Sequence, residues 1–198
     1  MPTKAKTTSK ASVKTQKPSA KKKTVSNFPK SKSGSAVNNA KLTQEQILAI
    51  KKSQFVDEVA KMKGIPKQPD YNEYLNRIIK SLPEEQRNIF IAFVTASKKK
   101  KIAVTDCKGK DLIISIAPKN EAGKILIKHY NSQNGTVKAS EILRMFDIVR
   151  TGNKSYSQGN TVYSIIKKKN NETYKTVVKI YSNGTDAVLK SFHSTIGY

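Results

Sequence analysis

The sequence has little of several features that define common classes of protein. It contains one cysteine, Cys107, so it can form neither an internal disulfide nor a cysteine-rich zinc site. We expect Cys107 to be a small buried thiol in a strand. No apolar run approaches the roughly 20 residues of a membrane-spanning helix, and no hydrophobic segment follows the charged N-terminus. We therefore expect no membrane partner and no secretory signal peptide.

Nucleotide-binding loops and metal-ligand clusters are also missing. Neither G-x-x-x-x-G-K-[ST] nor G-x-G-x-x-G occurs, which argues against ATP-driven chemistry. The only histidines are His129 and His193, too few for a histidine-rich metal site. The acidic residues of the C-terminal part are too scattered for the paired carboxylates of two-metal phosphodiester cleavage. We expect no cofactor and no metal ion, which leaves metal-free acid–base chemistry or pure binding.

Positive charge is abundant and unevenly distributed. The 198 residues include 38 Lys and Arg against 14 Asp and Glu, a net charge of +24. Residues 1–41 contribute +11, residues 42–97 only +1, the four lysines at 98–101 +4, and residues 102–198 +8. Such an excess favours polyanionic partners, because neutralising phosphates releases counterions. The residues predicted to bind nucleic acid are Lys21, Lys22, Lys23, Lys98, Lys99, Lys100, Lys101, Lys167, Lys168, Lys169, Lys175 and Lys179.

Residues 1–41 are built mainly from Lys, Ser, Thr, Ala and Pro. Such a segment buries too little apolar surface to offset its ordering entropy, so we predict a disordered basic arm. The arm could wrap nucleic acid, serve as a nuclear address around Lys21 to Lys23, or act as a solvated tail. We therefore expect the protein to be cytoplasmic or associated with a virion, and to be nuclear if the host is eukaryotic.

Residues 42–97 are predicted to form three helices. Thr43 and Gln46 make a capping-box pattern at the start of the first. The second is expected to begin at Asp70 and the third at Ser81. Large apolar residues recur at helical spacing in all three, among them Leu48, Phe55, Val59, Met62, Tyr71, Tyr74, Leu75, Ile78, Ile89, Phe90 and Phe93. These stripes could form a partner groove, but we interpret them as core.

After the lysine run the pattern changes to short strands and helices. We expect a hairpin of strands 102–104 and 112–116, helices 122–130 and 139–149, a polar loop between Gly152 and Gly159, and strands 162–168, 174–181 and 187–194. The predicted fold class is therefore α+β, with an antiparallel meander at the C-terminus. The expected parts are the basic arm 1–41, a three-helix segment 42–97 and an α+β domain 102–198.

The two histidines are the main candidates for catalysis. Metal-free RNA cleavage needs a base for the 2′-hydroxyl and an acid for the leaving 5′-oxygen, and histidine suits either role. Strand alternation places Ser191, His193 and Thr195 on one face. We predict His129 and His193 as the acid–base pair, with Ser191, Thr195 and Tyr156 as hydroxyl donors. The alternative is that each histidine is an ordinary residue with no proton role.

The order of features over residues 120–198 resembles a known group of nucleases. The features are Lys128-His129-Tyr130, the helix 139–144, Ser155-Tyr156, and a meander ending in Leu189 to His193. Together they resemble the phage-associated branch of the barnase–EndoU–colicin–RelE-like ribonucleases, which occur as toxin or cargo domains. The resemblance implies a metal-independent endoribonuclease, with roles for His129 and for Ser191 or Thr195. It also implies an immunity or capsid protein as partner.

This sequence departs from the family pattern in two ways. It carries His193 near the final hydroxyl position, and its meander has no clear arginine. Lys167, Lys175 and Lys179 would have to hold phosphate instead. The competing hypothesis is a non-catalytic virion or chromatin-type protein that packages DNA or RNA through the arm and Lys98 to Lys101. We do not expect the protein to recognise a specific nucleotide sequence, because no helix-turn-helix, zinc-finger or RNA-recognition signature occurs.

Overall fold

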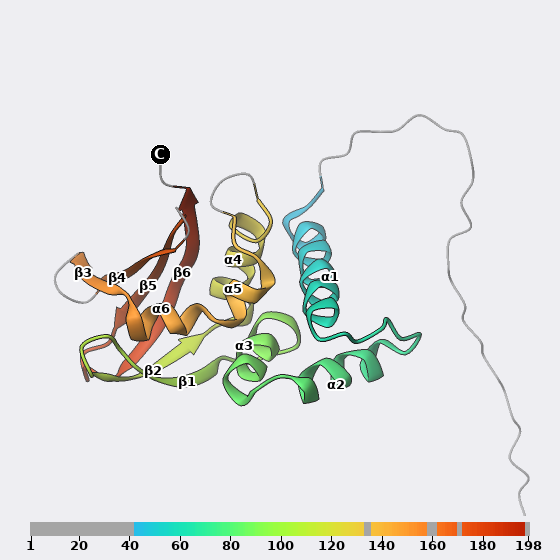
Figure 1. Ribbon diagram of the computed structural model, residues 1–198, viewed down its shortest axis with the longest axis horizontal. Coiled ribbons are helices and arrows are strands. Elements are labelled where there is room, and N and C mark those ends of the chain that lie inside the picture. Colours follow the sequence, from blue (N-terminus) through green and yellow to red (C-terminus); the bar gives the residue numbers. More distant parts are fainter. Residues whose placement is uncertain (1–41, 133–135, 158–161, 170–171, 197–198) are drawn as a thin grey trace, which may run out of the picture. The chain divides into compact units, whose positions relative to one another are not determined.

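Helices and a six-stranded sheet make up the described part of the chain, which confirms the α+β fold class (Figure 1). The structure is a computed structural model that describes residues 42–132, 136–157, 162–169 and 172–196. The predicted arm, with Lys21 to Lys23, lies outside these residues. The elements in chain order are α1 (Gln44–Met62), α2 (Tyr71–Ser81), α3 (Glu84–Val94), β1 (Lys100–Thr105), β2 (Asp111–Ile116), the π-helical turn η1 (Pro118–Ala122), α4 (Gly123–Lys128), α5 (Ala139–Leu143), α6 (Met145–Thr151), β3 (Asn153–Ser157), β4 (Val162–Lys169), β5 (Glu172–Ile180) and β6 (Asp186–Ile196).

The first two helices begin at side-chain caps. The predicted capping box is confirmed, because Gln46 N donates to Thr43 Oγ1 at 3.2 Å and Thr43 N donates to Gln46 Oε1 at 2.9 Å. Asp70 caps α2 by accepting from two backbone N–H groups. The predicted start of the third helix at Ser81 is wrong, since α3 begins at Glu84 directly after Pro83. The Ser81 hydroxyl instead donates to Ile78 O at 2.7 Å, in the last turn of α2.

The helix predicted over 139–149 is divided into α5 and α6. The break is at Arg144, whose φ of −116° and ψ of 17° leave the helical region. Its guanidinium pairs with Asp147 at 2.8 Å, in the first turn of α6. The apolar spacing continues across the break, so the hydrophobic pattern alone does not reveal it.

The sheet has the strand order β1-β2-β6-β5-β4-β3 and is mixed. All neighbouring strands are antiparallel except β2 and β6, which pair in parallel over a short stretch. The predicted hairpin β1–β2 and meander β4–β5–β6 are confirmed. The predicted polar loop between Gly152 and Gly159 is wrong over Asn153–Ser157, which forms the edge strand β3. Its polar residues favour a loop locally, but pairing with β4 satisfies their backbone groups.

A continuous core joins the N-terminal helices to the sheet. Phe55 of α1 lies fully buried, with its ring 5.9 Å from those of Phe90 and Phe93 and 5.6 Å from that of Tyr130. Helices α4 and α5 lie between α1 and the strands (Figure 1). The segments expected at 42–97 and 102–198 are thus parts of one compact unit, which spans residues 40–198. The core interpretation of the stripes is confirmed except at Met62 and Tyr71, which are 46% and 52% exposed.

The tip of the β1–β2 hairpin is anchored by a buried ion pair. Lys154 Nζ of β3 lies 2.6 Å from Asp106 Oδ2, and both side chains are almost fully buried. Burial opposes ionisation of Asp106, but hydrogen bonds from Lys154 and from the N–H groups of Lys110 and Lys108 hold its pKa below the ordinary value. The neighbouring Cys107 lies in the turn and is half-buried, so the prediction of a buried strand thiol is wrong.

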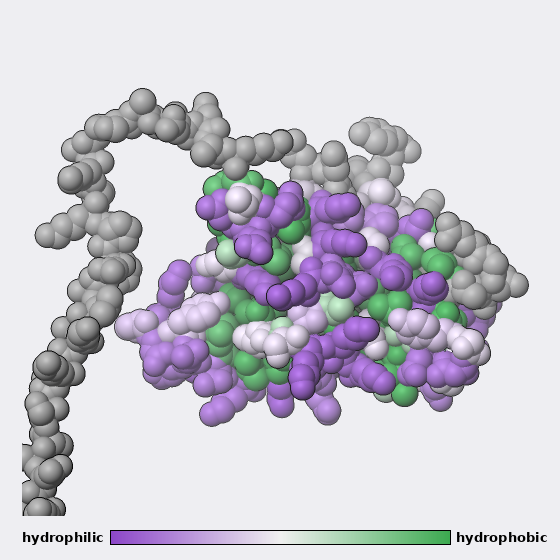
Figure 2. Space-filling view, turned by 180° about the vertical axis from the view of Figure 1, so that it is seen from behind, coloured by the Kyte–Doolittle hydropathy of each residue, from purple (hydrophilic) through white to green (hydrophobic). Residues whose placement is uncertain are grey.

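The surface opposite the view of Figure 1 is mainly hydrophilic, with smaller hydrophobic patches between the polar side chains (Figure 2). Among the described residues, no helix has both the length and the apolar character needed to span a membrane. Hydrophilic side chains thus cover most of this surface.

Candidate active site

A β-bulge in β6 determines which of its side chains point away from the core. Val177 of β5 pairs with Ser191, whereas the next residue, Val178, pairs with Leu189, so Lys190 has no partner in β5. One extra residue shifts the alternation of a strand to the other face. Leu189 and Phe192 can therefore both be fully buried. The same shift places Ser191 and His193 on the face away from that core.

His129 is brought to this strand by the end of α4. It is the C-cap of the helix, and its N–H donates to Ile125 O at 2.9 Å. Its carbonyl accepts from Val137 N at 2.9 Å, where the chain returns toward α5. The imidazole then stacks on that of His193, with ring centroids 5.1 Å apart and planes inclined by 29°. The two predicted acid–base candidates therefore lie in contact.

Further polar groups adjoin the histidine pair. Ser191 Oγ lies 3.2 Å from His193 Nδ1, and Lys175 is the residue directly opposite His193 in β5. Both histidines are half-buried. In the described part of the chain, His129 Nδ1 is buried and has no hydrogen-bond partner. The site thus combines two imidazoles, a hydroxyl and an ammonium group.

The surroundings lower the pKa of both histidines. For His129 the main cause is burial, with a smaller contribution from the charge of Lys128. Burial is also the main cause for His193, and His129 and Lys175 lower its pKa further. Two imidazolium ions at this distance would repel each other, so double protonation is disfavoured. Both imidazoles therefore take up a proton at a lower pH than a free histidine, and a proton on one ring opposes a proton on the other.

The predicted hydroxyl donors do not all reach the histidines. Ser191 does, as its hydrogen bond to His193 shows. Thr195 is exposed near the end of β6, and its Oγ1 lies 3.5 Å from Thr173 O. Tyr156 lies in β3, which β4 and β5 separate from β6, a distance of about 14 Å at the usual strand spacing. The side chain of Tyr156 lies outside the described residues.

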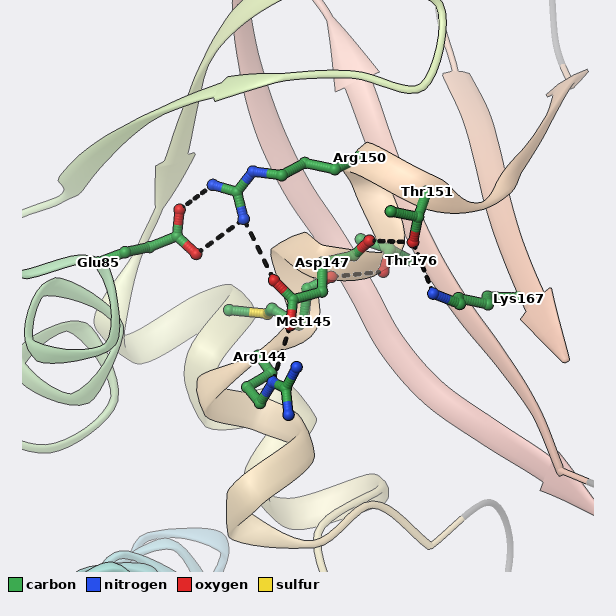
Figure 3. A network of polar contacts seen from close by, with 8 residues as sticks. All are labelled: Glu85, Arg144, Met145, Asp147, Arg150, Thr151, Lys167 and Thr176. Carbon is green, nitrogen blue, oxygen red and sulfur yellow. Dashed lines mark hydrogen bonds and ion pairs between the residues drawn. The ribbon is translucent and has the colours of Figure 1, made fainter. Parts of the chain in front are cut away.

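The predicted lysines are spread over different parts of the molecule. Lys175 lies beside His193, and Lys179 is exposed further along β5. Lys167 points to the helix-covered face, where its Nζ donates to Thr151 Oγ1 at 2.8 Å (Figure 3). Lys98 and Lys99, just before β1, and Lys101, within it, are exposed, and β2 separates β1 from β6. The side chains of Lys168 and Lys169 lie outside the described residues.

A polar network on the helix-covered face fastens α6 to its neighbours (Figure 3). Arg150 pairs with Glu85 of α3 through both carboxylate oxygens, and its Nη1 lies 3.4 Å from Asp147. Thr176 Oγ1 of β5 lies 3.5 Å from Met145 O. These contacts join α3, α6 and β5, so we assign the network a structural role.

A cavity of about 200 Å³ also lies on the helix-covered face. Its lining residues are Ser140, Glu141, Arg144, Asp147, Ile148, Lys167, Tyr174 and Phe192. The Tyr174 hydroxyl lies within hydrogen-bond distance of the carboxylates of Glu141 and Glu172. Phe192 alternates with Ser191 and His193 along β6, so this cavity and the histidine pair occupy different faces of the sheet.

Two residues of α1 contact the histidine-bearing segment and were not predicted from the sequence. Lys51 Nζ donates to Tyr130 O at 2.9 Å, and Glu58 accepts from Tyr130 Oη at 2.6 Å. They lie four residues before and three after the buried Phe55, on the same side of the helix. The sequence did contain a signal for these two residues, because they are charged side chains within the apolar stripe of this helix.

Among the residues that the structure describes, no group of three or more His, Cys, Asp or Glu is arranged to hold a metal ion. The groups at the histidine pair are instead those of proton transfer and anion binding. Comparisons of the chain with protein-family models, curated proteins and solved structures found no match. The functional assignment therefore depends on the chemistry of the histidine site.

Proposed function

We propose that this chain is a metal-independent endoribonuclease in which His129 and His193 transfer the protons. The observation that carries the proposal is the stacking of the two imidazoles at 5.1 Å. The 2′-oxygen that attacks and the 5′-oxygen that leaves are bound to the same phosphorus. Neighbouring imidazoles can therefore each lie within hydrogen-bond reach of one of these oxygens.

The surroundings of the two rings suggest different roles. Ser191 can donate to a bare His193 Nδ1 or accept from a protonated one, so His193 has a partner in either state. His129 has no such partner at its buried Nδ1, so its imidazolium form lacks the stabilisation that Ser191 gives to that of His193. We assign His129 as the base and His193 as the acid.

The proposed reaction balances without a cofactor. His129 takes the 2′-hydroxyl proton while the 2′-oxygen attacks phosphorus, and the bond from phosphorus to the 5′-oxygen breaks. His193 gives its proton to that oxygen, which leaves as a 5′-hydroxyl. The products are a 2′,3′-cyclic phosphate and a free 5′ end. Lys175, opposite His193, supplies positive charge for the developing phosphorane.

Charge and sequence support an RNA substrate. The net charge of +24 favours a polyanion, and residues 102–198, which include both histidines, carry +8 of it. The half-buried rings lie on the sheet face opposite the helix-lined cavity. The resemblance of residues 120–198 to metal-independent ribonucleases points to the same reaction class.

Incubation of the purified protein with RNA in EDTA tests the proposal. We expect cleavage by the wild type and a loss of about 100-fold or more in His129→Ala and in His193→Ala. Lys167→Ala, on the other face of the sheet, is the matched control for a change of surface charge. Bound but intact RNA would favour the packaging-protein interpretation. Equal cleavage by the wild type and the histidine variants would overturn the assignment of the histidines as the catalytic pair.

A further inference from the structure

We infer that α1 positions His129 for catalysis through Glu58 and Lys51. The inference rests on the proposed function, in which His129 is the base. It assigns to the helical segment 42–97 a part in the active site.

Glu58 holds both ends of the connection between α4 and α5. Its Oε2 accepts from Tyr130 Oη at 2.6 Å and from Asn131 Nδ2 at 3.4 Å, directly after His129. Its Oε1 accepts from Ala139 N at 3.1 Å, at the first residue of α5. One carboxylate thus fixes the chain at Tyr130 and Asn131, directly after His129, and again at Ala139.

Lys51 fixes the backbone between these points. Its Nζ donates to Tyr130 O at 2.9 Å and to Asn131 O at 3.1 Å. Val137 N donates to His129 O at 2.9 Å. The carbonyl oxygens of three successive residues, beginning with His129, therefore all have donors. Asn131 has a φ of 45°, a left-handed conformation that asparagine adopts more readily than most residues other than glycine, and these contacts hold it.

Tyr130 transmits the position of α1 to the adjacent histidine. Its side chain is fully buried, and its ring lies edge-on against Phe55 of α1 at an interplanar angle of 88°. Burial and the hydrogen bond to Glu58 raise the pKa of Tyr130, so its hydroxyl remains a donor. The backbone at Tyr130 cannot shift without disturbing this packing. The His129 ring is thereby held against His193.

Glu58→Gln is the most specific test, because it keeps the size of the side chain but exchanges one acceptor oxygen for an amide that only donates. Lys51→Met removes the two contacts to the backbone. Glu45→Gln and Lys61→Met change the same charges at exposed positions of the same helix and serve as matched controls.

NMR of the imidazole groups gives a readout that does not depend on RNA cleavage. We expect Glu58→Gln and Lys51→Met to weaken the cross-relaxation between the rings of His129 and His193 and to raise the pKa of His129 toward its ordinary value. The control variants should leave both unchanged. Unchanged His129 signals in folded Glu58→Gln would overturn the inference, even if the wild type cleaves RNA. Altered signals in a chain that does not cleave RNA would instead count against the proposed function alone.

Kinetics separate positioning from general stability. We expect Glu58→Gln to lower kcat about ten- to hundredfold with little change in KM. In the His129→Ala background the same substitution should cause no further loss, whereas a purely structural role would reduce activity equally in both backgrounds. If Glu58→Gln does not fold, Tyr130→Phe removes the same hydrogen bond and keeps the ring. An unchanged His129 pKa in that variant would overturn the inference as well.

Discussion

His129 stacks on His193 across two segments that are distant in the sequence, the end of α4 and the last strand of the sheet. The rings are half-buried and close enough that protonation of one disfavours protonation of the other. When one imidazole is neutral and the other is protonated, the pair provides a base and an acid at the same time. This relationship is the basis of the proposed reaction and of the first two predictions.

Substrates with a good leaving group should distinguish the two histidines. A ribonucleoside 3′-(4-nitrophenyl phosphate) releases a phenolate that needs no protonation. We expect this substrate to restore most of the activity of His193→Ala, the acid variant, and little of that of His129→Ala. Release of nitrophenolate measured by absorbance gives both rates. Rescue of His129→Ala instead would reverse the assignment of acid and base.

The stability of the fold should decrease as the pH falls below neutral. The pKa of each histidine is lowered in the folded state, so the unfolded chain takes up protons first, near its ordinary value of about 6.5. Stability is therefore present above that pH and is lost as the pH falls toward the folded values. Urea denaturation should give a lower midpoint at pH 5.5 than at pH 7.5.

The variant His129→Asn with His193→Asn should lose most of this pH dependence. Lys175→Met should weaken it, because Lys175 contributes to the lowered pKa of His193. Lys128 likewise contributes to the lowered pKa of His129. An equal fall in the midpoint for the wild type and the double variant would show that the histidines do not titrate in this manner.

Lys175 and Lys167 should differ in their effect on cleavage. They lie on adjacent strands, but Lys175 pairs in register with His193 whereas Lys167 donates to Thr151 on the helix-covered face. We expect Lys175→Ala to lower kcat about ten- to hundredfold and to raise the pKa of His193. Lys167→Ala should stay close to the wild type. Equal losses in the two variants would indicate a general effect of surface charge.

Much of the fold could be predicted from the sequence because its signals are local. The cap at Thr43, the hairpin β1–β2 and the meander β4–β5–β6 follow from residue types at fixed spacing. Strand β3 could not be predicted in this way, because its residues are mainly polar and it becomes a strand by pairing with β4. The division between α5 and α6 at Arg144 was also hidden, since the apolar spacing does not change there.

The sequence indicated which residue types could serve in catalysis but not which of them meet. Alternation placed Ser191 with His193, and their hydrogen bond agrees with it. Contact between His129 and His193 depends on the path of α4 along β6, which no local pattern encodes. Glu58 was missed because its partners lie more than 70 positions away.

Glycine is required at position 152 but not at position 123. A Cβ on Gly152 would lie 2.6 Å from Ile165 Cγ2 and 2.7 Å from Ile148 O, so backbone would have to move. We expect Gly152→Ala to lower the free energy of unfolding by about 1–3 kcal/mol. A Cβ on Gly123 would meet nothing closer than 3.4 Å. Gly123→Ala should be neutral or gain up to about 1 kcal/mol in helix propensity. Chemical denaturation of both variants checks the contrast.

A DNA oligonucleotide that contains a single ribonucleotide tests the central claim most directly. With EDTA present, we expect the wild type to cut only after the ribonucleotide and to leave a 2′,3′-cyclic phosphate and a 5′-hydroxyl, identified by mass spectrometry. The rate of cleavage by His129→Ala and by His193→Ala should be lower by about 100-fold or more. The all-DNA oligonucleotide should remain intact. Cleavage of the all-DNA strand, equal cleavage by both histidine variants, or no cleavage of RNA by the folded wild type would contradict the account.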